Sequence, residues 1–226
     1  MSAETPRAGS ERGLREELCR VGASLFSRGY VHGTTGNLSA RLDDGFLITA
    51  TDACLGTLQP EALAKVDAVG RPLDGARPSK TLALHRRIYE ADREAGCIIH
   101  THSSHLVRLS LAASGPREDF IPPITPYFVM KVGHVPLIGY HQPGHPAVAD
   151  RVAEAIAVAR TRGAPIRAVM LARLGPNVWH DTPAAACAVL EELEETARLW
   201  LAGAPPPAPL DEAQIDELRA HFDARW

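Results

Sequence analysis

Helical segments with one apolar face alternate along this chain with short runs of β-branched residues. In residues 11–28, Leu18, Val21 and Leu25 recur at intervals of three and four, so they share one face of a helix. Residues 96–100 instead form a short run containing two isoleucines, which is typical of a buried strand. Elements that each bury one face must pack in layers, so the alternation predicts a three-layer α/β/α domain.

The expected elements are bounded mostly by glycine, proline and other turn residues. A hairpin is predicted where Asp43, Asp44 and Gly45 separate two apolar runs. Helices are predicted over residues 11–28, 81–91, 103–113, 146–162, 183–201 and 210–222, and further strands over residues 65–67, 96–100, 135–139, 168–172 and 177–179.

The chain length bounds the number of domains. With 226 residues, the chain fits one α/β domain better than two. We expect a disordered tail over residues 1–10 and a single domain over residues 11–203. Residues 204–226 should form a stiff proline-rich linker followed by a C-terminal docking helix.

Charge and composition exclude several classes of protein. The net charge is −3 and no basic run is present, which argues against nucleic acid as the main partner. Residues 1–14 lack the apolar core of a secretory signal, and no stretch is apolar enough to span a membrane. The four cysteines have no CxxC spacing, which favours free thiols over a zinc ribbon or a redox motif. We therefore expect a cytoplasmic protein that binds neither membranes nor nucleic acid.

Two histidines mark the end of one predicted strand. His100 and His102 are separated by a single residue, and alternate residues of a strand point to the same face. The two imidazoles can therefore bind one cation together, and zinc, iron and manganese all suit them. The alternative is a pair of histidines that form hydrogen bonds within a loop.

Two further segments offer groups that bind anions. Thr35, Gly36 and Asn37 provide a hydroxyl, a flexible backbone and a carboxamide, although most loops of this composition are simple turns. Ser79 and Lys80 precede a predicted helix. Ser79 can cap that helix, and its free N–H groups together with Lys80 can bind an anion. The alternative is a plain capped helix.

Tyr127 follows Pro126 in a proline-rich stretch. The prolines hold the backbone stiffly and could aim the phenol as a proton donor. The alternative, which is the commoner outcome, is a tyrosine packed in the core.

Five ordered blocks, HGTTGNLSAR, PSK, IIHTHSSH, PPITPYFVMKVGHVPLIGYHQPG and LEELEETARL, resemble the class II aldolase/adducin-like family. Within it, the chain looks most like the 3-oxo-tetronate 4-phosphate decarboxylases. The resemblance implies a central, mostly antiparallel sheet and a divalent metal, usually zinc, that stabilises an enediolate during carbon–carbon cleavage or decarboxylation.

The resemblance also implies roles for individual residues. It places His100 and His102 on the first two histidine ligands of the metal. Thr35, Gly36 and Asn37 fall on the phosphate and substrate loop, and Ser79 falls on a second phosphate contact.

Tyr127 matches a tyrosine that, in the family, reaches the site of a neighbouring subunit. The resemblance therefore implies a homo-oligomer, with a tetramer expected, that acts on a small molecule.

Three positions depart from the family's pattern. Thr81 replaces a glutamate that serves as base and metal ligand, and Leu174 replaces the third histidine. Asp52 replaces a glycine and would repel a phosphate group. Asp52 could instead complete a site of two histidines and one carboxylate. Arg173, at the position of an asparagine, could bind a substrate carboxylate or form a surface ion pair.

Two kinds of function remain open at this point. The first is a divergent metal-dependent lyase that acts on a sugar acid or keto acid, with iron-dependent oxidation as a variant of the same site. The second is a non-catalytic binding or scaffold protein of the adducin type, which the loss of the base and of the third histidine would favour.

Overall fold

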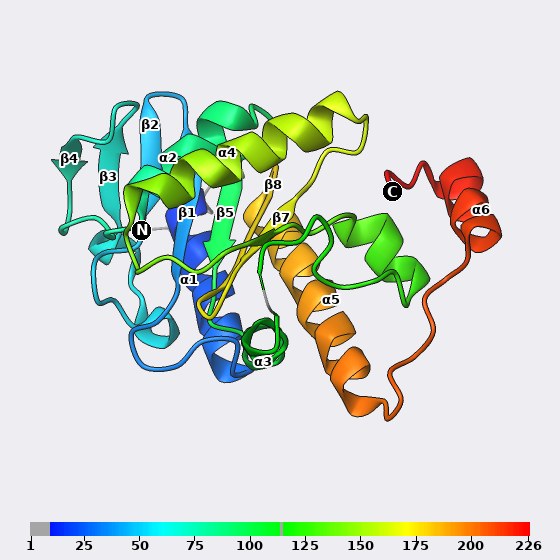
Figure 1. The fold of residues 1–226 in the computed structure, drawn as a ribbon. Helices are drawn as coiled ribbons and strands as arrows, with labels where there is room; N and C mark the ends of the chain where they lie inside the picture. Colours follow the sequence, from blue (N-terminus) through cyan, green and yellow to red (C-terminus); the bar gives the residue numbers. More distant parts are fainter. Residues whose placement is uncertain (1–9, 114) are drawn as a thin grey trace, which may run out of the picture.

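The computed structural model describes residues 10–113 and 115–226 (Figure 1). The tail expected over residues 1–10 thus lies outside the described residues except for Ser10. Ser10 belongs to the fold, because it is the N-cap of helix α1 (Glu11–Ser27) and its Oγ accepts a hydrogen bond from the Gly13 N–H at 3.1 Å.

A central sheet forms the middle layer of the domain. Its described strands run in the order β4-β3-β2-β1-β5-β8-β7-β6, and every neighbouring pair is antiparallel except β6 and β7. The prediction of a mostly antiparallel sheet is therefore confirmed. The strands are β1 (Asn37–Leu42), β2 (Gly45–Ile48), β3 (Ala64–Asp67), β4 (Pro72–Asp74), β5 (Cys97–His100), β6 (Leu137–Ile138), β7 (Ala168–Leu171) and β8 (Gly175–His180).

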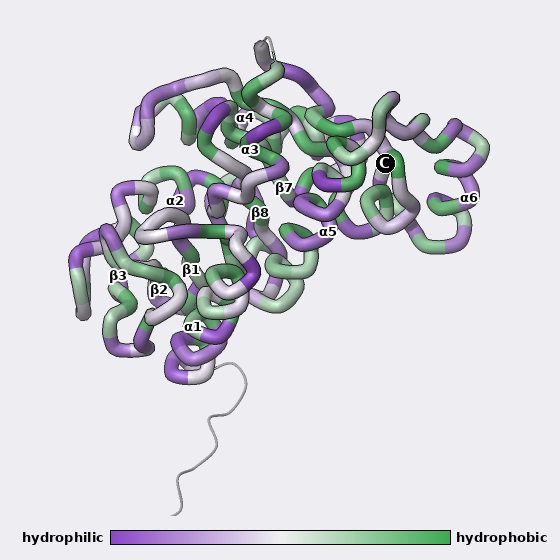
Figure 2. The backbone as a smooth tube through the Cα atoms, turned by 90° about the horizontal axis from the view of Figure 1, so that it is seen from below, coloured by the Kyte–Doolittle hydropathy of each residue, from purple (hydrophilic) through white to green (hydrophobic). Residues whose placement is uncertain are grey.

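Helices cover both faces of the sheet (Figure 1). Helices α2 (Leu82–Ala91) and α4 (Pro146–Thr161) lie on one face, with α1, α3 (Ser104–Leu111) and α5 (Pro183–Ala202) on the other. The alternation of strand side chains produces a core on each side: Ile98 belongs to the cluster under α2 and α4, and Ile99 to the cluster against α1 and α5. Hydrophobic and hydrophilic residues alternate along helices such as α5 in Figure 2, as burial of one face requires.

The connections hold most of the differences from prediction. Two 3-10 turns, η1 (Leu55–Thr57) and η2 (Pro60–Ala62), and the edge strand β4 lie between β2 and α2, and of these only η1 and β4 were not expected. A π-helical turn, η3 (Phe128–Val132), which was not expected, follows the proline-rich stretch around Pro126. The strand expected over residues 135–139 shortens to β6, which pairs in parallel with β7, and its Leu137 also forms an isolated bridge with Arg117.

The C-terminal helix α6 (Glu212–Phe222) stands apart from the three layers (Figure 1). A capping box between Asp211 and Gln214 begins the helix. Leu218 packs with Val129 and Ala224 in a small cluster of their own. Among the described residues, no helix combines the length and the apolarity that crossing a membrane would require.

Candidate functional site

A pocket of about 550 Å³ opens where β5 ends. Five other segments border it: the loop that leads into β1, residues 50–52 after β2, the N-terminus of α2, residues 142–149 at the start of α4, and residues 171–177 around the turn from β7 to β8. The pocket gathers eight of the residues predicted from the sequence: Thr35, Gly36, Asn37, Asp52, Ser79, Lys80, His100 and His102. The antiparallel sheet brings them together, because the start of β1 lies beside the end of β5.

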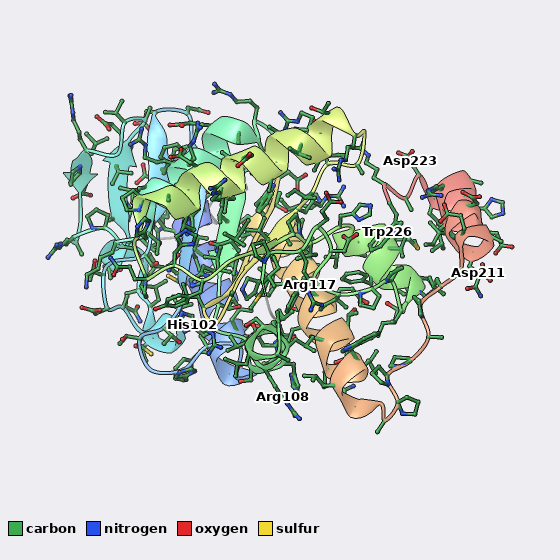
Figure 3. The ribbon with its side chains drawn as sticks, viewed as in Figure 1. His102, Arg108, Arg117, Asp211, Asp223 and Trp226 are labelled. Carbon is green, nitrogen blue, oxygen red and sulfur yellow. The ribbon has the colours of Figure 1, made fainter. Side chains whose placement is uncertain are left out.

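The histidine pair lies at the centre of this pocket. The His100 and His102 rings are 5.1 Å apart between centroids. His100 Nδ1 lies 2.8 Å from the carbonyl oxygen of Pro176, and because a carbonyl oxygen only accepts, Nδ1 donates and Nε2 carries the free lone pair. Figure 3 places His102 just beyond β5, on the opposite side of the molecule from Trp226.

Both imidazoles are uncharged at neutral pH. Burial lowers the pKa of His100 to about 4, and the neighbouring His102 makes a smaller contribution in the same direction. Burial also lowers the pKa of His102, and the neighbouring His32 makes a smaller contribution in the same direction. Neutral imidazoles are the form that binds metal ions, so the pair fits a divalent cation.

The remaining ligands of such a cation are not supplied by the usual side chains. Among the described residues, no group of three or more histidine, cysteine, aspartate or glutamate side chains is arranged to hold a metal. Asp52 lines the pocket but is exposed and not grouped with the histidines. His32, which the sequence did not single out, has its ring 6.3 Å from that of His102.

Two glycines allow the backbone to close around the histidines. Gly36 has a φ of 82°, and a Cβ there would lie 2.9 Å from the carbonyl oxygen of His100. Gly175 has a φ of 138°, and a Cβ there would lie 1.9 Å from the carbonyl oxygen of Thr101. Any side chain at either position would push the loop or β8 away from the histidine strand.

The N-terminus of α2 forms the part of the pocket suited to an anion. The helix begins at Leu82, and its N-cap, Thr81, makes no side-chain capping bond. The expectation that Ser79 caps the helix is therefore wrong: its Oγ lies 3.0 Å from Thr81 Oγ1 and accepts only a long bond, 3.4 Å, from the Thr81 N–H. The Leu82 N–H donates to the Ser79 carbonyl oxygen at 3.1 Å, so the N–H groups of Ala83 and Leu84 are the ones available to a ligand. Both residues line the pocket together with Lys80.

Asp52, Thr81 and Leu174, which we expect to depart from the family's pattern, all line this same pocket. Asp52 has a φ of 61°, a conformation that glycine adopts without strain, which explains the glycine of the pattern. Arg173 has a φ of 67°, and asparagine tolerates that region better than arginine.

Arg173 and Tyr127 are not brought into the pocket. Arg173 is exposed at the turn between β7 and β8, where its backbone N–H donates to Ser110 Oγ at 2.9 Å. The strand expected over residues 177–179 begins two residues earlier, at Gly175. Tyr127 is 62% exposed, so it is not a core tyrosine, and it does not line the pocket of its own chain.

A buried polar cluster lies on the same face of the sheet. Ser39 Oγ is 2.7 Å from His85 Nδ1 and 2.8 Å from the Tyr89 hydroxyl. Burial lowers the pKa of His85 to about 3, with a smaller contribution from the neighbouring His100, so this ring is neutral. Neither Ser39 nor His85 was singled out from the sequence as a functional residue.

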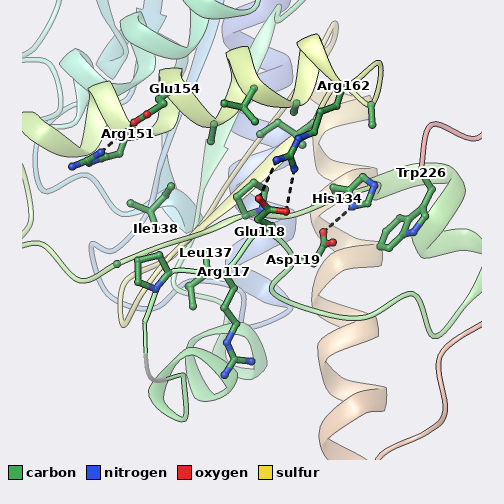
Figure 4. A pocket seen from close by; sticks show the side chains of 18 of the residues that line it. Arg117, Glu118, Asp119, His134, Leu137, Ile138, Arg151, Glu154, Arg162 and Trp226 are labelled. Atoms are coloured by element: carbon green, nitrogen blue, oxygen red, sulfur yellow. Dashed lines mark hydrogen bonds and ion pairs between the residues drawn. The ribbon is translucent and has the colours of Figure 1, made fainter.

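The structure also contains a larger cavity, of about 1070 Å³, between α4, β6 and the C-terminus. Its charged side chains mostly pair with one another, as Figure 4 shows for Arg162 with Glu118 and for His134 with Asp119. None of the residues predicted to be functional lines this cavity. The smaller pocket at the histidine pair is therefore the candidate active site.

Comparisons with known proteins identify the family of this chain. The profile of the Class II Aldolase and Adducin N-terminal domain matches residues 16–201. The chain is 54% identical over 222 residues to a 3-oxo-tetronate 4-phosphate decarboxylase of Cupriavidus necator, covering 96% of this chain and 99% of that protein. It is 40% identical over 212 residues to the protein of the same name in Escherichia coli K12, covering 93% and 97%.

Solved structures share the fold. The YgbL protein of Klebsiella pneumoniae superimposes with a TM-score of 0.84 at 41% identity, covering 94% of this chain and all of that one. An L-fuculose 1-phosphate aldolase superimposes with a TM-score of 0.79 at 23% identity, covering 93% and 96%, which supports the fold alone. The chain belongs to the class II aldolase and adducin N-terminal domain family, in the branch that contains the 3-oxo-tetronate 4-phosphate decarboxylases.

Proposed function

We propose that this protein is a carbon–carbon lyase that decarboxylates 3-oxo-tetronate 4-phosphate or a closely similar phosphorylated keto acid. The observation that carries the proposal is the pocket itself, whose lining includes two neutral imidazoles, the N-terminus of α2 and Lys80. The 54% identity to a protein named for this reaction points to the substrate.

The reaction follows from the structure of the substrate. The carboxylate is attached to a carbon that bears a hydroxyl and stands next to a ketone. Breaking the bond to the carboxyl carbon releases CO₂ and moves the bonding electron pair toward the ketone oxygen. A proton then joins the carbon that lost CO₂, and the product is dihydroxyacetone phosphate.

The pocket residues divide this task. Lys80, Ser79 and the N–H groups of α2 bind the phosphate, and the loop of Thr35 and Gly36 closes over it. His100 and His102 would hold a divalent metal, with zinc as our first choice and iron or manganese as alternatives. When bound, the metal supplies positive charge beside the ketone oxygen.

Thr81, in place of the glutamate that the family's pattern predicts, alters which reaction this site can support. Cleavage of a carbon–carbon bond next to a hydroxyl requires a base to remove the hydroxyl proton, and Thr81 cannot serve as that base. Decarboxylation of a 3-keto acid needs no such base, because the departing group is already an anion. Replacement of the glutamate by Thr81 is thus compatible with decarboxylation and unfavourable to aldol cleavage.

Asp52 is our candidate for a second ionisable group in the reaction. Its carboxylate lines the pocket, but it is exposed and apart from the histidines. A catalytic role therefore requires its side chain to turn toward them when substrate binds. Arg173 could bind the substrate's carboxylate only after a similar movement, because it lies outside the pocket.

The decisive experiment is incubation of the purified protein, loaded with zinc, manganese or iron(II), with 3-oxo-tetronate 4-phosphate. We expect CO₂ and dihydroxyacetone phosphate to form in equal amounts, faster than in buffer with the same metal. Absence of turnover with all three metals, together with no metal retained after gel filtration, would instead establish the non-catalytic, adducin-like alternative. Oxidised products in the presence of iron and oxygen would indicate a re-purposed oxidative site.

We also propose that the protein is a homo-oligomer, with a tetramer expected. Tyr127 supports this, because its phenol is 62% exposed and lies outside the pocket of its own chain. In an oligomer, it can reach a neighbouring site as the proton donor. Multi-angle light scattering should give a mass near four chains, and a monomeric mass would contradict the assignment of Tyr127.

A further inference from the structure

Asn177 is a buried polar residue at the bottom of the candidate active site. It is 1% exposed and lines the pocket, yet neither Oδ1 nor Nδ2 has a hydrogen-bond partner among the residues that the structure describes. Most buried carboxamides are satisfied, and leaving one unpaired typically costs stability. The residue therefore needs an explanation outside the folded chain.

The strand pairing places this carboxamide beside His100. Asn177 on β8 and Asn37 on β1 are the two cross-strand partners of His100 on β5. Cross-strand partners project from the same face of a sheet, so the imidazole is flanked by two carboxamides. Asn37 Oδ1 is also buried without a partner. The floor of the pocket is thus a row of three polar side chains with unused hydrogen-bonding capacity.

Asparagine is also a poor choice for the strand itself. Residues 175–179 of β8 are all buried, and asparagine is depleted in strands, whereas valine is enriched. Its neighbours Val178 and Trp179 pack in the two apolar cores. Packing therefore gives no reason for an amide at this position.

The unused atoms indicate what kind of ligand the residue accepts. A phosphate or a carboxylate only accepts hydrogen bonds, so it would leave Oδ1 unpaired, and a metal ion would leave Nδ2 unpaired. A hydroxyl next to a carbonyl satisfies both: the hydroxyl donates to Oδ1, and the carbonyl accepts from Nδ2. The substrate's ketone and its neighbouring hydroxyl form such a pair.

We infer that Asn177 is a specificity-determining residue whose carboxamide binds the α-hydroxyketone unit of the ligand beside His100. This inference rests on the proposed function for the identity of the ligand, and it adds a residue that recognises the hydroxyl. It predicts that the protein discriminates between two phosphates that differ only in that hydroxyl.

The test compares dihydroxyacetone phosphate with acetol phosphate, which lacks only the hydroxyl group, by isothermal titration calorimetry. Wild-type protein should bind dihydroxyacetone phosphate more tightly by roughly ten- to a hundredfold, and Asn177→Val should abolish that preference. Asn177→Ala should do the same if valine overfills the site. The metal content should be unchanged in both variants.

Thermal unfolding without ligand provides a second readout. Asn177→Val removes an unpaired buried amide, so its midpoint should rise while ligand discrimination falls. The matched control is Thr196→Val. Thr196 is a buried polar residue of α5, later in the chain than Asn177, and its hydroxyl contacts Glu192. That change should leave discrimination intact and should not raise the midpoint.

The outcomes separate this inference from the proposed function. Wild-type decarboxylation together with an unchanged preference in Asn177→Val would overturn the inference and leave the function in place. Discrimination that is lost in the variant, without any decarboxylation by wild type, would support the inference and refute the function. A lowered unfolding midpoint, loss of metal in the variant, or binding of neither phosphate by wild-type protein would overturn the inference.

Discussion

His102→Ala should abolish metal binding and reduce decarboxylation at least about a thousandfold. Removing the metal's stabilisation of charge on the ketone oxygen costs several kcal/mol, and every ~1.4 kcal/mol is a factor of ten in rate. His100 alone cannot retain a divalent ion against buffer, because the described residues supply no third histidine, cysteine or carboxylate ligand. Metal content after gel filtration and dihydroxyacetone phosphate release, corrected for uncatalysed decarboxylation, measure the two effects.

His105→Ala is the matched control for this variant. His105 lies three residues further along, where its Nδ1 is 2.8 Å from the Glu194 carboxylate, and it does not line the pocket. The control should keep its metal and its turnover. Unchanged metal content in His102→Ala would refute the assignment of the ligand pair.

The double variant Thr81→Glu and Leu174→His should bind metal at least about tenfold more tightly and acquire aldol cleavage. Both positions line the pocket beside the histidines, so the new imidazole can act as a third ligand and the new carboxylate as a base. A positioned general base contributes about a hundred- to ten-thousandfold to such a rate. Cleavage of L-fuculose 1-phosphate, followed through release of dihydroxyacetone phosphate, should rise from background by a factor in that range.

The control combines Thr81→Gln with Leu174→His. Glutamine matches glutamate in size but cannot take up the hydroxyl proton, so this variant should gain metal affinity without gaining cleavage. The variant Thr81→Glu with Leu174→His could instead lose decarboxylation without gaining cleavage. That result would mean that Thr81 and Leu174 serve the native reaction and that the site is re-purposed. Robust aldol cleavage by the unmodified protein would mean that the departures have little effect.

The amino-acid sequence by itself determined the layers of this fold and several residues of its candidate site. One-sided helices such as residues 11–28 and buried runs such as residues 96–100 encode their burial locally, through periodicity. His100 and His102 could be identified as a pair because they lie one residue apart on a strand. Short motifs and the family resemblance then pointed to further pocket residues, such as Ser79 and Thr81, without knowledge of contacts.

Only the tertiary structure decided which of those residues meet and which additional ones join them. Asn177 and His100 are 77 positions apart and become partners only through the pairing of β5 with β8. The unpaired state of the Asn177 carboxamide follows from what packs around it, which no local pattern records. Likewise, only the structure shows that Arg173, at the turn between β7 and β8, and the exposed Tyr127 both lie outside the pocket of their own chain. The sequence determines local conformation and chemical type, whereas hydrogen-bond satisfaction and cross-strand proximity exist only after the chain has folded.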